Sequence, residues 1–95
     1  MNRARSQTPI TRLDTLRKGA RGIVVGVDPA AEAAQGVPPE ALRRLVEIGF
    51  VAGEPVEVVA TAFPHGDPIA VRIGTTRFAL RKVEAQAVWI EPEVA

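Results

Sequence analysis

A helix stop inside residues 42–55 constrains the fold of this chain more than any other feature. The stretch reads Leu-Arg-Arg-Leu-Val-Glu-Ile-Gly-Phe-Val-Ala-Gly-Glu-Pro. Leu42, Leu45 and Val46 are three and four residues apart, and this spacing predicts a helix with all three on one face. Gly49 suits the left-handed residue that ends a helix, because glycine adopts a positive φ at almost no cost. So short a helix must pack against another element.

The residues after the stop predict what that element is. Phe50 falls at the position that makes the closing apolar contact of such a helix end, back onto Leu45. Gly53 and Pro55 then form a turn, and the β-branched run that follows begins a strand. The helix is therefore expected to dock beside a small sheet.

Short strands separated by turn residues account for most of the remaining sequence. Gly22 and Gly26, inside the first β-branched run, predict a bulge or a strong bend. The predicted strands cover residues 20–27, 56–63, 68–73, 76–80 and 87–91, the helix covers 39–48, and single helical turns cover 9–16 and 81–85. Five short strands with one inserted helix predict a mainly β chain that forms a small, strongly bent barrel.

The few aromatic residues are predicted to lie in the core. A chain of 95 residues has room for one compact core, and Leu80 and Val83 are expected to join it. Binding of single-stranded nucleic acid needs exposed aromatic platforms beside basic groups, so no nucleic-acid partner is expected. The predicted core aromatics are Phe50, Phe63, Phe78 and Trp89.

One domain is expected over residues 9–91, between a basic tail at 1–8 and a short tail at 92–95. The net charge is only +1, but residues 1–21 hold six basic side chains and one acid. Such an arm either steers toward an acidic partner or is a solvated terminus.

The composition excludes several classes of protein. The chain has no cysteine, which rules out a disulfide scaffold and a thiolate metal site. No apolar run approaches the roughly 20 residues of a membrane helix, and the first residues lack the apolar core of a secretory signal. Ser6 is the sole serine and no Gly-rich phosphate loop is present. We therefore expect a cytoplasmic interaction module that is not an enzyme and does not insert directly into a membrane.

Three phrases carry a family resemblance. They are Arg-Arg-Leu-Val-Glu-Ile-Gly-Phe at 43–50, Gly-Asp-Pro-Ile-Ala-Val-Arg-Ile-Gly at 66–74 and Phe-Ala-Leu-Arg-Lys-Val-Glu-Ala at 78–85. In this order and spacing the chain resembles the FeoA family, over about residues 13–90. The resemblance implies an SH3-like small β-barrel with a helical insertion. It also implies a small accessory protein of bacterial ferrous iron uptake, whose partner is a FeoB-like membrane GTPase transporter.

The resemblance implies that the helix and the loops beside it bind and modulate the cytosolic GTPase part of that transporter. One alternative is a solvated helix face, in which Arg43 and Arg44 pair with Glu40 and Glu47. Another is catalytic: an arginine from a partner can enter a nucleotide site and stabilise transition-state charge. The expected partner-binding residues are Arg43, Arg44, Glu47, Arg81 and Lys82.

A second function remains open, that of a divalent-metal sensor or carrier related to the SH3-like domains of iron-dependent repressors. His65, the only histidine, lies two residues before Asp67, and imidazole and carboxylate are both ligands for divalent metals. A zinc site usually needs four groups, so the structural alternative is an exposed histidine with Asp67 capping its own turn. No cofactor is required; Fe²⁺ or adventitious Zn²⁺ would bind at this pair. An exposed barrel edge would also allow a homodimer.

Overall fold

The computed structural model describes residues 9–28, 37–62 and 64–93 of the chain. In these residues it contains six strands, two short α-helices and one turn of 3-10 helix. In chain order the elements are β1 (Thr11–Arg12), η1 (Leu13–Thr15), β2 (Arg21–Val27), α2 (Pro39–Glu47), β3 (Pro55–Thr61), β4 (Ile69–Ile73), β5 (Thr76–Leu80), α3 (Lys82–Ala85) and β6 (Val88–Pro92).

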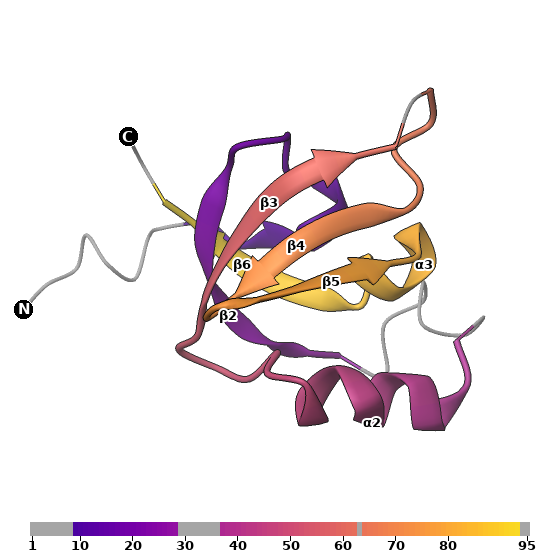
Figure 1. Cartoon of the computed structure of the whole chain (residues 1–95). Coiled ribbons are helices and arrows are strands. Elements are labelled where there is room, and N and C mark those ends of the chain that lie inside the picture. Colours follow the sequence, from indigo (N-terminus) through magenta and orange to yellow (C-terminus); the bar gives the residue numbers. More distant parts are fainter. Residues whose placement is uncertain (1–8, 29–36, 63, 94–95) are drawn as a thin grey trace, which may run out of the picture.

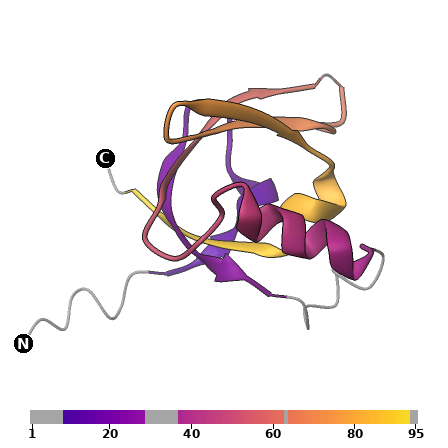
Figure 2. The ribbon, with the colours of Figure 1, turned by 60° about the horizontal axis from the view of Figure 1, so that its bottom comes forward.

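The strands form one antiparallel sheet in the order β1-β6-β2-β3-β4-β5, which curls around a single core (Figure 1). Helix α2 lies below the curled sheet in Figure 1 and crosses its open end in Figure 2. The fold is the expected mainly β, SH3-like barrel with an inserted helix. Its closure is incomplete, because the two edge strands, β1 and β5, do not pair with each other.

The end of α2 has the predicted geometry. Gly49 has a φ of +126°. Its N–H donates to the carbonyl of Val46 at 3.1 Å, and the N–H of Phe50 donates to the carbonyl of Leu45 at 3.0 Å. These are the two hydrogen bonds of a Schellman stop. Phe50 is fully buried, so the stop turns the chain directly into the core.

The first long strand is bent as its glycines predict. The pairing of β2 with β6 shifts register between Val24 and Gly26, which identifies a bulge. Gly22 is needed for a different reason: a Cβ there would lie 2.5 Å from Cγ2 of Ile90 and 2.7 Å from the carbonyl oxygen of Glu91. Strand β6 can pair this closely with β2 only because residue 22 has no side chain.

Three residues predicted to face the core are on the surface or half-buried. Val46 is 44% exposed, because the buried stripe of α2 runs through Leu42 and Leu45 and one residue step turns Val46 away from it. Val83 is 41% exposed and Ala85 is the buried residue of the short α3. Trp89 points outward, since strand alternation places its buried neighbours on the inner face.

Other predictions differ only in extent. The region predicted as a helical turn over 9–16 contains η1, but Thr11 and Arg12 pair with β6 and add a sixth strand. Two residues are too few for strand periodicity to show in the sequence. Strand β6 extends to Pro92, one residue beyond the predicted end. Phe78 is half-buried against the core, and Phe63 lies outside the described residues, as does most of the long loop after β2.

Candidate functional site

The predicted partner-binding side chains of α2 all reach solvent. Arg43, Arg44 and Glu47 are exposed, because the opposite face of the helix carries the buried leucines. In the described part of the chain the one ion pair joins Arg72 and Glu57 on neighbouring strands. The alternative in which the α2 arginines pair along the helix is therefore not observed.

The basic pair at the start of α3, Arg81 and Lys82, is also exposed, and the acids beside it accept hydrogen bonds from the backbone. The backbone N–H of Arg81 donates to Oε1 of Glu84 at 2.9 Å, and the N–H of Lys82 donates to Oδ1 of Asp67 at 3.1 Å. These acids satisfy the first donors of the helix, which would otherwise lack a partner. The Arg81 and Lys82 side chains are exposed and form no ion pair among the described residues.

The fold brings α2 and α3 together, although more than 30 residues separate them in sequence. In Figure 1 α3 stands above one end of α2, and in Figure 2 the two helices overlap. Arg44 of α2 and Glu84 of α3 line one narrow crevice, floored by Leu45 and Phe78. Its free space of about 30 Å³ is roughly a tenth or less of the volume of a small-molecule pocket. The site is therefore a surface and not a ligand pocket.

We call this surface the basic helical surface. Each helix also exposes a valine that sequence reasoning assigned to the core: Val83 on α3, and Val46 on the flank of α2 that faces away from the crevice. Aliphatic side chains among cations are the mixture expected of a protein-binding surface. The sequence did contain a signal for their exposure, because charged residues lie close to each valine along the chain. The members of the surface are Arg43, Arg44, Val46, Glu47, Arg81, Lys82 and Val83.

The structure does not assemble a metal site around His65 and Asp67. Both are exposed in the turn before β4, and the carboxylate of Asp67 holds the start of α3. Among the described residues no three histidine or acidic side chains are grouped as metal ligands would be. Asp67 caps a helix, and not its own turn as the structural alternative proposed.

A polar cluster between β1 and β6 was not foreseen. The Arg12 guanidinium lies 4.5 Å from the centre of the Trp89 ring, and its Nη1 donates to the carbonyl of Gln86 at 2.7 Å. The Trp89 indole N–H points to Oδ2 of Asp28 at 3.4 Å. The Arg12 contacts attach the short β1 to β6, and the Trp89 hydrogen bond joins β6 to the residue after β2. The register that creates them, Arg12 opposite Trp89, is a tertiary feature.

Comparison with known proteins identifies the family. A sequence model described as the FeoA domain matches residues 11–92. The chain belongs to the FeoA domain family. One structure, that of Stenotrophomonas maltophilia FeoA complexed with zinc, is 35% identical, with a TM-score of 0.71 over 87% of this chain and 95% of that one. The FeoA-like protein of Clostridium acetobutylicum is 26% identical, with a TM-score of 0.75 over 94% and 93%.

The FeoA fold also occurs inside a larger protein. A manganese-dependent transcriptional repressor is 25% identical, with a TM-score of 0.73 over 92% of this chain but only 44% of the repressor. No curated protein sequence matches the chain significantly. Within the described residues, no helix of this FeoA-family chain is long and apolar enough to cross a membrane.

Proposed function

We propose that this FeoA-family protein is a non-catalytic, cytoplasmic accessory protein of bacterial ferrous iron uptake. It binds the cytosolic GTPase part of a FeoB-like membrane transporter through the basic helical surface. The observation that carries the proposal is that four cations, Arg43 and Arg44 on α2 and Arg81 and Lys82 at the start of α3, are exposed and lack ion-pair partners in the described chain. Family membership supplies the setting in ferrous iron transport.

The charges of the surface favour an acidic partner. The surface as defined carries four cations and one acid, Glu47; the neighbouring acids Glu84 and Asp67 keep their charge but are held at the start of α3 by backbone N–H groups. Exposed charges add little affinity singly, but they accelerate encounter and orient the partner. The valines at positions 46 and 83 supply apolar area that only a partner would cover.

The basic helical surface is rigid, and this rigidity allows the protein to act on its partner. Helix α2 is clamped at its end by the Schellman stop, and α3 by its two acidic caps. A rigid surface that fits one conformation of the partner better than another shifts the equilibrium toward that conformation. The protein thus modulates the transporter without any catalytic group of its own.

A binding titration tests the proposal. The isolated cytosolic domain of the transporter encoded with this protein is titrated by calorimetry, with and without Fe²⁺. We expect metal-independent binding that the double variant R43E/R44E weakens at least tenfold, since each reversed charge turns attraction into repulsion. Arg17→Glu, an exposed reversal outside the surface, is the matched control. Equal affinity of R43E/R44E and wild type would refute the assignment of the surface.

Metal sensing or carriage is the second candidate. The likeness to a manganese-dependent repressor favours it, as does the zinc complex of the Stenotrophomonas maltophilia protein. It requires Fe²⁺ to bind the chain alone at His65 and Asp67. Calorimetry with Fe²⁺ under anaerobic conditions, on wild type and His65→Ala, distinguishes the two. Stoichiometric binding that is lost in His65→Ala would favour the sensor.

A further inference from the structure

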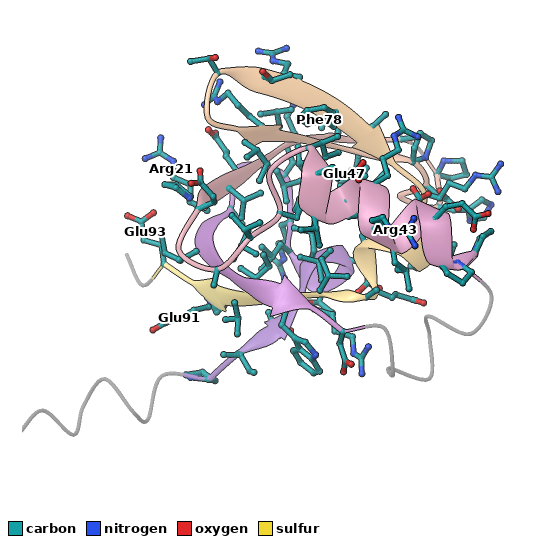
Figure 3. All side chains as sticks on the ribbon, turned by 90° about the horizontal axis from the view of Figure 1, so that it is seen from below. Arg21, Arg43, Glu47, Phe78, Glu91 and Glu93 are labelled. Carbon is teal, nitrogen blue, oxygen red and sulfur yellow. The ribbon has the colours of Figure 1, made fainter. Side chains whose placement is uncertain are left out.

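A second surface lies at the other end of the molecule. Figure 3 shows Arg21, Glu91 and Glu93 projecting from one end, away from Arg43 on α2. They border an open groove of about 720 Å³, which is formed by β2, β3, β6 and the β4–β5 turn. The proposed function uses no residue of this groove.

The groove has an apolar centre on the outer face of the sheet. Ile23 is 40% exposed, because its neighbour Val24 occupies the inner face of β2. Ile23 is paired with Glu91 on β6 and with Pro55 on β3. The pairing of β1 with β6, continued by one residue, places Ile10 on the far side of Glu91, and Ile10 is 49% exposed. Ile10 and Ile23 thus lie on either side of Glu91, and Pro55 lies beyond Ile23.

The charges around this centre include both signs. Arg72 and Glu57 neutralise each other. Arg21, Glu91 and Glu93 form no ion pair among the described residues, although the backbone of Glu93 is hydrogen-bonded to that of Arg21. One cation and two anions that have no ion-pair partner among the described residues therefore flank the exposed aliphatic residues.

We propose that a second copy of this chain docks on this groove, with a two-fold axis near Ile23. A two-fold interface uses the same patch on both subunits, so the patch must complement itself. This patch does: Arg21 of each copy faces Glu91 and Glu93 of the other, and the Ile23 side chains cover one another. The dimer carries a basic helical surface at each outer end, and so engages two partner sites at once with a gain in avidity.

Charge reversal tests the arrangement. Sedimentation equilibrium is measured with a chelator present, so that no metal bridges the copies. We expect a wild-type dimer, and at least tenfold weaker self-association of both Arg21→Glu and the double variant E91R/E93R, since like charges would then face each other. An equimolar mixture of these two variants should associate again. A monomeric wild type, or a mixture that stays monomeric, overturns the proposal.

A cysteine placed at the axis gives an independent readout. The chain contains no cysteine, so Ile23→Cys introduces a single thiol. If the axis passes near this residue, mild oxidation links two copies by a disulfide within minutes. Val46→Cys, of similar exposure on α2, is the matched control and should stay unlinked. A dimer that forms without cross-linking at position 23 would assign the contact to another face, such as a strand edge, and would overturn the proposal.

Discussion

At the scale of single residues, the conformation of one glycine determines whether α2 can end where it does. Gly49 has a positive φ, and a Cβ there would lie 3.0 Å from Cγ2 of Ile73. Gly49→Ala should therefore lower the free energy of unfolding by about 1–3 kcal/mol, from backbone strain and crowding together. Urea denaturation followed by circular dichroism measures the change.

Gly26→Ala is the control for this prediction. Gly26 does not have a positive φ, and a Cβ there meets no atom within 4 Å. We expect the stability of this variant to lie within about 0.5 kcal/mol of wild type. If Gly49→Ala were as harmless as Gly26→Ala, the Schellman stop would not be what holds α2 in place.

Arg12 is the residue that attaches β1 to the sheet. Its guanidinium stacks on Trp89 and donates to the Gln86 carbonyl. Arg12→Ala removes a cation–π contact and a charge-assisted hydrogen bond, and should cost about 1–2 kcal/mol of stability at this half-buried site. The same denaturation experiment measures it, with exposed Arg17→Ala as the control. Equal stability of the two variants would contradict this role.

At the scale of secondary-structure elements, α2 allows the adaptor and the catalytic-arginine hypotheses to be separated. Arg43 and Arg44 lie on an exposed helix face, and the crevice that Arg44 lines is too small for a nucleotide. As partner contacts, single alanine variants should weaken the complex by up to about tenfold. The GTPase rate of the transporter's cytosolic domain, measured at saturation with each variant, should not change.

The catalytic alternative makes the opposite prediction for the same measurement. An arginine that enters a nucleotide site contributes about 10³–10⁵ in rate where it occurs. Loss of most of the stimulated rate at saturation, in either variant, would therefore show that α2 acts in catalysis. Lys82→Ala on α3 serves as a variant that changes charge on the same surface without touching α2.

At the scale of the whole molecule, two surfaces at opposite ends of the fold differ in electrostatic character. The basic helical surface as defined carries four cations and one acid, whereas the groove beside Ile23 is lined by both signs. Partner binding should therefore weaken at least tenfold between about 50 and 500 mM salt, because exposed charges are screened over a few ångströms at high ionic strength. Calorimetric titrations across this range measure the effect. An affinity independent of salt would mean that apolar contacts dominate the interface.

The elements of this fold could be read from local sequence because each rests on a short-range rule. The stop at Gly49, the turn before β3 and the alternation in β4 need only neighbours in the chain. The bulge in β2 was likewise visible from its glycines. Val46, Val83 and Trp89 were misassigned because apolar character does not state which of two faces is buried.

The pairing of strands that are distant in sequence determines which residues meet in the fold, and local sequence rules do not. Arg12 meets Trp89, Arg44 shares a crevice with Glu84, and Glu91 lies beside Ile23 because the sheet brings segments tens of residues apart into register. The residues of the basic helical surface were recognisable in the chain as exposed charges. Their assembly into one surface depends on where α2 and α3 pack. Such packing minimises the exposed apolar area of the whole chain. A short window of sequence does not include the distant residues that contribute to this total area.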